Sequence, residues 1–369
     1  MTDLSPGRTT PDLFAPLSLS RGPDMKNRLM LAPMINQQSH PDGRLADTEL
    51  NWLEMRAKGG FGLVMTCATS VQANGFGFPG QLGIFSDDHV PGLTRLATAL
   101  NAHDTHSVLQ LYHGGMRCPP ELVNNDLVAP SADERSGARA MTTDEVKQLA
   151  DDFIAGAKRA DQAGFDGVEI HGAHGYQICA FLSPTLNRRE DAYGGDLDGR
   201  SRLLFDIVDG VRAACRPDFS IGVRLSPERF GQRLGEIRQV AQRLMTEQKI
   251  DYIDMSLWDV FKEPVEDEFK GRPLVDWFTE LDRGPVRLGG AGKLAGGDDA
   301  RRALAAGLDF AVIGRAAILH HDFPQAIAAD PDFTALPLPV SVDHLRSQGV
   351  GDAFLRYLGE WDGFLKESA

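Results

Sequence analysis

Apolar and polar positions along the chain form two kinds of segment that alternate from about residue 28 onward. Short, almost continuously apolar runs predict buried strands, and the longer stretches between them repeat their apolar residues at helical spacing. The strands are expected at residues 28–32, 63–67, 108–112, 167–171, 221–225, 252–256, 286–289 and 310–314. Helices are expected at residues 47–58, 91–101, 144–162, 200–214, 235–247, 273–281 and 298–306. Eight strands alternating with helices predict an α/β fold, a single closed (β/α)8 TIM barrel.

Residues at the helix boundaries support this interpretation. Thr143 precedes a first turn that carries Asp144 and Glu145, which is typical of a helix start. Gly164 and Gly307 stand where helices are expected to end, because glycine readily adopts the left-handed backbone conformation found there. A doubly wound sheet would usually carry a G-x-G-x-x-G turn after its first strand. Here Ala-Pro-Met follows that strand, which favours the barrel.

Segments on either side of the barrel predict two short additions to one domain. Residues 1–27, rich in Pro, Ser and Gly, are expected to cap the bottom of the barrel as a hairpin or coil. Residues 28–330 form the predicted barrel. Residues 331–369 are expected to form a helical tail, in which one face carries Phe354, Leu355, Leu358 and Trp361. We interpret this stripe as packing.

Composition and charge narrow the class of protein. Hydrophobic residues make up 42% of the 369 residues and charged residues 24%, which excludes a collagen-like or disordered chain. The formal charge of −14 argues against nucleic acid and anionic membranes as partners, because both are polyanions. No apolar run reaches the ~18 residues of a membrane span, and the first residues do not resemble a signal peptide, so a cytoplasmic location is expected. The sequence leaves open whether the chain forms a homo-oligomer.

Chemistry in a TIM barrel is expected at the C-terminal ends of the strands. The fourth strand ends in a segment with His171, His174 and Tyr176, which places two imidazoles and a phenol within six residues. The two ring N–H groups could donate to one oxygen and polarise a carbonyl group, while the phenol offers a proton. We therefore predict that these three residues are catalytic.

Two more polar residues near strand ends predict a ligand with several hydrogen-bonding edges. Arg224 ends the fifth strand and is expected to face a ligand that develops negative charge, with a structural salt bridge as the alternative. Gln110 alternates into the barrel interior, where its amide can both donate and accept. That combination suits a flat heterocycle with imide-like edges.

Glycines at the last two strands predict a phosphate site. Gly290 lies in a glycine-rich run after the seventh strand, and Gly314 and Arg315 follow the eighth. TIM barrels often bind phosphate here through backbone N–H groups, and Arg315 would supply the counter-charge. The alternative is that the glycines only mark tight turns.

A metal-dependent barrel hydrolase is a competing interpretation. Such enzymes collect several histidine ligands with Asp, Glu or Lys at the strand ends. His171 and His174 could be two ligands, but no carboxylate or further histidine is plainly placed to complete the shell, and Arg224 would repel a cation. Four scattered cysteines without a C-x-x-C pair also disfavour a zinc or iron–sulfur site. No metal site is therefore predicted.

Specific motifs stand at these strand ends and in the loops that follow them. They are Leu-Ala-Pro-Met ending at Met34, Gln110-Leu-x-His-x-Gly, His171-x-x-His174-Gly-Tyr176, Asn187-Arg-Arg-x-Asp-x-Tyr-Gly-Gly, Arg224-x-Ser and Gly314-Arg315. Together they resemble the old yellow enzyme family of FMN-dependent NADH:flavin oxidoreductases. The resemblance covers residues 27–330, nearly the whole barrel.

The resemblance implies that the barrel binds FMN. Gln110 would contact the pyrimidine edge of the flavin and Arg224 its N1/O2 side. The ring would be lined by Pro33, Met34 and Ala68, and the phosphate would be bound by Gly290, Gly314 and Arg315.

The resemblance also implies a reaction in two halves. NADH or NADPH would reduce the flavin, and an activated small-molecule alkene, such as an enone or enal, would then bind with its carbonyl oxygen on His171 and His174. The flavin would give hydride to the β-carbon and Tyr176 a proton to the α-carbon. Two positions depart from the family pattern, since many members carry Cys or Thr at Ile35 and some carry Tyr at Gln37. A non-catalytic flavin-binding protein, with the tail as a docking element, is the remaining alternative.

Overall fold

Eight parallel strands close into one barrel in the computed structural model, which describes residues 11–366. Around the barrel the strands follow the order β1, β2, β3, β6, β7, β8, β9 and β10, and β10 pairs with β1. The bounds are Leu29–Leu31 (β1), Leu63–Ser70 (β2), His106–Tyr112 (β3), Gly167–Gly172 (β6), Ser220–Leu225 (β7), Tyr252–Ser256 (β8), Arg287–Ala291 (β9) and Phe310–Ile313 (β10). Two short strands, β4 (Val128–Ala129) and β5 (Arg139–Ala140), pair with each other in the segment between β3 and β6. The predicted TIM barrel is confirmed.

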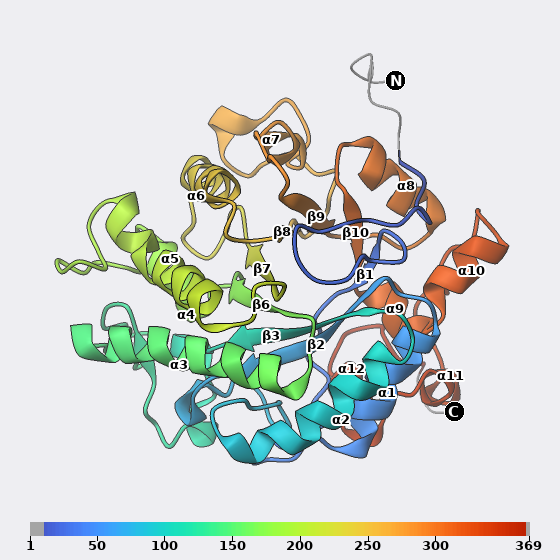
Figure 1. Cartoon of the computed structure of the whole chain (residues 1–369), viewed down its shortest axis with the longest axis horizontal. Helices are drawn as coiled ribbons and strands as arrows, with labels where there is room; N and C mark the ends of the chain where they lie inside the picture. Colours follow the sequence, from blue (N-terminus) through green and yellow to red (C-terminus); the bar gives the residue numbers. More distant parts are fainter. Residues whose placement is uncertain (1–10, 367–369) are drawn as a thin grey trace.

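Helices surround the barrel, as Figure 1 shows. Those close to their predicted bounds are α1 (Asp47–Lys58), α2 (Val90–Asn101), α3 (Thr143–Ala163), α5 (Leu197–Ala214), α6 (Leu234–Glu247) and α8 (Gly297–Ala305). The sequence did not predict α4 (Gln177–Leu182), α9 (Arg315–Leu319) or α10 (Phe323–Ala329). The prediction of a helix over residues 273–281 was too long, since α7 covers only Asp276–Thr279. Leu274 donates its N–H to the Lys262 carbonyl oxygen at 2.7 Å, which holds the preceding residues in a loop.

The ends of α3 correct one boundary and confirm another. The N-cap is Thr142 rather than Thr143, because the Thr142 hydroxyl accepts the Glu145 N–H and a Glu145 carboxylate oxygen accepts the Thr142 N–H. This reciprocal capping box satisfies two N–H groups that the helix itself leaves free. At the other end Gly164 has φ +91°, the left-handed conformation that glycine allows.

The interior of the barrel is apolar at its lower end. Inward-facing side chains of the strands pack together there, namely Met30, Leu63, Met65, Val108, Tyr252, Phe310 and Val312. Leu17 and Met25 close this cluster from below, and their backbones form an antiparallel bridge in the N-terminal hairpin. Arg21 of the hairpin pairs with Asp251, which directly precedes β8. Residues 17–25 of the N-terminal segment thus pack against the lower end of the barrel interior.

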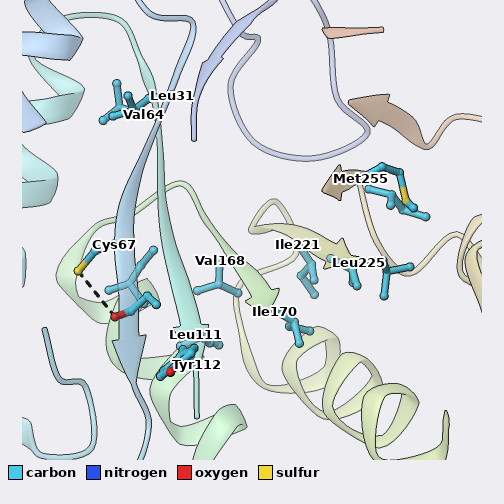
Figure 2. Packing of buried hydrophobic residues seen from close by; sticks show 14 of the residues in the cluster. Leu31, Val64, Cys67, Leu111, Tyr112, Val168, Ile170, Ile221, Leu225 and Met255 are labelled. Carbon is cyan, nitrogen blue, oxygen red and sulfur yellow. Dashed lines mark hydrogen bonds between the residues drawn. The ribbon is translucent and has the colours of Figure 1, made fainter. Parts of the chain in front are cut away.

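Outward-facing side chains form the larger core between barrel and helices. Figure 2 labels ten residues of this core, among them Val64 of β2, Leu111 of β3, Ile170 of β6 and Ile221 of β7. Alternate residues of each strand point to opposite faces, so the same strands supply both cores. Both faces of the strands are therefore buried, and the chemistry is confined to the strand ends.

The C-terminal tail folds back beside α1 (Figure 1). Its helices are α11 (Val342–Ser347) and α12 (Asp352–Gly359), and the Phe354 ring packs edge-on against Trp52 of α1 at 5.7 Å between centroids. Gly351, before α12, donates its N–H to the Gln38 side-chain oxygen at 2.8 Å, which ties the tail to the loop after β1. Within residues 11–366, no helix combines the length and apolar character needed to cross a membrane.

Candidate active site

A cavity of about 400 Å³ opens at the C-terminal ends of the strands; we call it the mouth cavity. Most of the predicted site residues line it, namely Pro33, Met34, Ala68, Gln110, His171, His174, Tyr176 and Arg224. They come from five different strands and the segments that follow them. Their assembly results from the common direction of parallel strands, because all the C-terminal ends meet at one face.

The predicted phosphate residues stand outside this lining. Gly290 lies within β9, and a Cβ there would come 2.9 Å from the Leu308 side chain. Gly314 precedes α9, and a Cβ there would meet only Ala32 and the Met34 sulfur, both at 3.8 Å or more. Arg315 begins α9, is exposed, and has no ion pair among residues 11–366. Gly314 therefore lies beside Met34 of the lining and has open space around it. Arg315, the next residue, carries a positive charge without an ion-pair partner among the described residues.

The two imidazoles are joined to each other and to a serine. His171 Nε2 lies 3.2 Å from His174 Nδ1, and His174 Nε2 lies 2.7 Å from the Ser256 hydroxyl. The backbone N–H of Ala173 donates to His171 Nδ1, so a neutral His171 carries its proton on Nε2. The His171 Nε2–H group therefore donates a hydrogen bond to His174 Nδ1. The prediction that both rings donate to one substrate oxygen stays a prediction. The two rings, at i and i+3, lie edge to face with 5.0 Å between their centroids, and the His174 N–H is directed to Ser256.

Backbone conformation brings the phenol to the imidazoles. His174 has φ +62° and Gly175 φ +73°, two successive left-handed residues that reverse the chain just after β6. A non-glycine residue in this region costs of the order of 1 kcal/mol, and such strain is typical of functional sites. The Tyr176 ring consequently lies edge-on to His171, with 5.1 Å between ring centroids.

Electrostatics keep all three groups in their uncharged forms. Burial, reinforced by His174 and Arg224, lowers the pKa of His171 well below its ordinary value. Burial, with Arg224 and Arg117, lowers the pKa of His174 to about 3. Burial raises the pKa of Tyr176, although Arg117 opposes this change. At neutral pH the cavity therefore holds two neutral imidazoles, which donate N–H groups, and a phenol that keeps its proton.

Arg224 combines the two roles that the sequence left open. Its Nε lies 3.0 Å from an Asp254 carboxylate oxygen, and both side chains are buried. The same guanidinium group lines the mouth cavity. One edge of Arg224 is thus held by a structural ion pair, while the guanidinium group also borders the cavity.

Aromatic residues that the sequence did not assign to the site also line the cavity. Tyr357 and Trp361 come from the tail, 5.6 Å apart between ring centroids, and Trp258 follows β8. Trp361 was interpreted as packing only, and it both packs on the core and borders the cavity. The i, i+4 spacing of the tail aromatics signals a shared face, but only the folded tail places that face over the barrel. Ile35 lines the cavity as well, whereas Gln37 does not.

The lining suits FMN by its own chemistry. Its volume falls within the ~300–1,000 Å³ of typical ligand sites. A buried guanidinium and an amide at one wall complement the carbonyl and imide edges of a flavin. By contrast, no group of three or more His, Cys, Asp or Glu residues within residues 11–366 could hold a metal ion, so the hydrolase alternative lacks a ligand set there.

The fold and this lining define a flavin-dependent barrel oxidoreductase. A family model for the NADH:flavin oxidoreductase / NADH oxidase family matches residues 12–330, and the chain belongs to this family. It is an NAD(P)H-dependent flavin oxidoreductase of the old yellow enzyme type, with FMN as the cofactor.

Individual relatives agree with this assignment. The chain is 36% identical over 333 residues to a probable NADH-dependent flavin oxidoreductase, YqiG, of Bacillus subtilis (strain 168), covering 87% of this chain and 86% of that protein. It is 33% identical to an NADH:fumarate oxidoreductase of Klebsiella pneumoniae (strain 342), covering 86% of this chain but only 36% of that longer protein. The solved old yellow enzyme homologue from Zymomonas mobilis superposes with a TM-score of 0.78 at 27% identity, covering 93% of this chain and 99% of that one.

Proposed function

We propose that this enzyme reduces the activated C=C bond of α,β-unsaturated carbonyl and related compounds with hydride from NADH or NADPH. The observation that carries the proposal is the meeting of two neutral imidazoles, a protonated phenol and Arg224 in one cavity. Such a set serves a substrate whose oxygen gains negative charge while a neighbouring carbon needs a proton. A non-catalytic flavin-binding protein would have no use for it.

Gln110 and Arg224 would hold the pyrimidine side of FMN, and Pro33, Met34 and Ala68 would line the ring. The phosphate would lie on Gly290, Gly314 and Arg315, where Arg315 has no other charge partner among the described residues. When bound, FMN accepts hydride from the nicotinamide and supplies it to the β-carbon of the substrate.

His171 and His174 would bind the substrate carbonyl oxygen. In the present geometry the His171 Nε2–H group donates a hydrogen bond to His174 Nδ1. A carbonyl oxygen that enters between the rings would accept this N–H in exchange, and a turn of His174 away from Ser256 would offer a second one. Because both imidazoles are neutral, they polarise the carbonyl without transferring a proton to its oxygen.

Tyr176 would complete the reduction. Hydride added to the β-carbon leaves an enolate, and the phenol gives its proton to the α-carbon, so one hydride and one proton saturate the double bond. The raised pKa of Tyr176 means that the group holds its proton until a strongly basic carbon is formed.

A panel of enones, maleimides, nitroalkenes and quinones tests the proposal directly. The FMN-loaded protein is expected to oxidise NADH or NADPH without oxygen and to yield the saturated product, measured by mass spectrometry. Anaerobic oxidation of the nicotinamide by quinones alone, with every alkene recovered intact, would leave a flavin oxidoreductase but refute the alkene reductase.

The pH profile gives a second, independent prediction. An ordinary histidine becomes charged below a pH of about 6.5, whereas the pKa of His174 is about 3. The alkene half-reaction of pre-reduced enzyme is therefore expected to stay flat between pH 5 and 7, because both imidazoles remain neutral and Tyr176 remains protonated. A fall in the observed rate constant centred near pH 6.5 would show that the imidazoles titrate normally.

A further inference from the structure

A layer of buried polar side chains lies beneath the mouth cavity. Gln110 of β3, Glu169 of β6, Arg224 of β7 and Asp254 of β8 all have at most 5% of their surface exposed. Only Gln110 and Arg224 of this set line the cavity. Glu169 and Asp254 stand behind them, and the mechanism proposed above gives Glu169 no role.

Glu169 determines how the Gln110 amide is oriented. The two residues are partners in the parallel register of β3 and β6, and Gln110 Nε2 donates to Glu169 Oε1 at 2.7 Å. An unpartnered amide can rotate and exchange its oxygen for its nitrogen. Glu169 Oε1 accepts from the Gln110 nitrogen, so the proton of a neutral Glu169 lies on Oε2, and this contact leaves the Gln110 oxygen free for a donor elsewhere, such as the imide N–H of a flavin.

The same carboxyl group also affects the charge of the layer. Burial and the neighbouring Asp254 raise the pKa of Glu169 to about 8, although Arg224 opposes them. The groups that face it are Gln110 from β3, Arg224 from β7, and Asp254 and the Tyr252 phenol from β8. Besides Gln110, the Tyr252 phenol interacts with the Glu169 carboxyl group and opposes the rise in its pKa. An Asp254 carboxylate oxygen lies 3.0 Å from Arg224 Nε, so the negative charge of Asp254 balances the positive charge of Arg224. A protonated Glu169 adds no further charge to the layer.

We propose that Glu169 is a positioning residue that orients Gln110 for the pyrimidine edge of the flavin and does so as a neutral carboxylic acid. The inference rests on the FMN placement proposed above. Glu169, which does not line the cavity, would then influence both the affinity for FMN and the midpoint potential of the flavin.

Two variants separate the hydrogen bond from the charge. Glu169→Gln keeps the shape, the acceptor oxygen and the neutral state, so its dissociation constant for FMN and its midpoint potential are expected to match those of the wild type. Glu169→Leu removes the acceptor and is expected to weaken FMN binding about tenfold, the effect of one lost hydrogen bond to a buried amide. Apoprotein titration with FMN and spectroelectrochemistry measure the two quantities.

A double-mutant cycle shows whether Glu169 acts through its partner. In a Gln110→Ala background, Glu169→Leu is expected to cause no further loss of FMN affinity. An equal tenfold loss in both backgrounds would overturn the positioning role. A changed midpoint potential in Glu169→Gln would overturn the neutral state.

The readouts also keep this inference apart from the proposed function. FMN affinity and midpoint potential do not depend on any alkene, so an enzyme that reduces no alkene leaves this test intact. If Glu169→Leu does not fold, as judged by circular dichroism of the apoprotein, Glu169→Gln and Gln110→Ala still decide the question. Weakened FMN binding in Glu169→Gln would then refute the proposal.

Discussion

Tyr176→Phe is expected to slow alkene reduction by about 100- to 1,000-fold, within the usual contribution of a general acid of about 10²- to 10⁴-fold. The variant loses one hydroxyl group and keeps the ring that packs edge-on to His171. Hydride transfer to the β-carbon would then lack a coupled proton donor for the α-carbon. Reduction of the flavin by NADH or NADPH needs no such proton and should proceed at the wild-type rate.

Stopped-flow measurement of the two half-reactions separates these effects. Tyr193→Phe is the matched control, because its phenol also has a raised pKa but bonds to Asp206 and does not line the mouth cavity. This control should leave both half-reactions unchanged. Wild-type alkene reduction in Tyr176→Phe, with flavin still bound, would show that another group or solvent supplies the proton.

His171→Ala is expected to lower the alkene half-reaction by about 100-fold and to weaken binding of enone ligands. The donor that polarises the substrate oxygen would be lost, and removal of one such donor typically costs about 10²- to 10³-fold. His174 would also lose the partner of its Nδ1 atom. Rapid-mixing kinetics at several substrate concentrations distinguish a slower chemical step from weaker binding.

Substitutions at His174 refine this expectation. His174→Asn keeps an N–H donor and should retain more activity than His174→Ala, because the role is hydrogen bonding rather than acid–base chemistry. His103→Ala, a half-buried histidine beside Glu54 and outside the mouth cavity, is the remote control. Equal activity of His174→Asn and His174→Ala would remove His174 from carbonyl binding.

Much of the fold could be predicted because its signals are local. Strands buried on both faces need continuous apolar runs, and all eight runs became barrel strands. One helix boundary was misplaced although a sequence signal for it existed, since Thr142 and Glu145 have the Thr-x-x-Glu spacing of a capping box, which selects Thr142 over Thr143. The helix expected over residues 273–281 was too long because the contact between Leu274 and Lys262 joins two loops.

The sequence likewise predicted some features of the candidate site and missed others. His171, His174, Tyr176 and Arg224 could be proposed together because parallel strands bring their ends to one face. The pairing of the two imidazoles, the partner of Arg224 and the aromatic contribution of the tail could not be proposed. Each of these depends on rotamers or on contacts between segments far apart in the chain.

The sequence by itself determined the (β/α)8 barrel, the family and the residues that meet at the mouth, because periodicity and strand-end position are properties of the chain order. Only the tertiary structure decided the electrostatic state of those residues. Burial depth and the distances to Arg224 and Arg117 set the pKa values of His174 and Tyr176, and no one-dimensional pattern records either quantity. The net charge of −14 describes the whole chain, while the lining of the mouth cavity includes a buried arginine, Arg224.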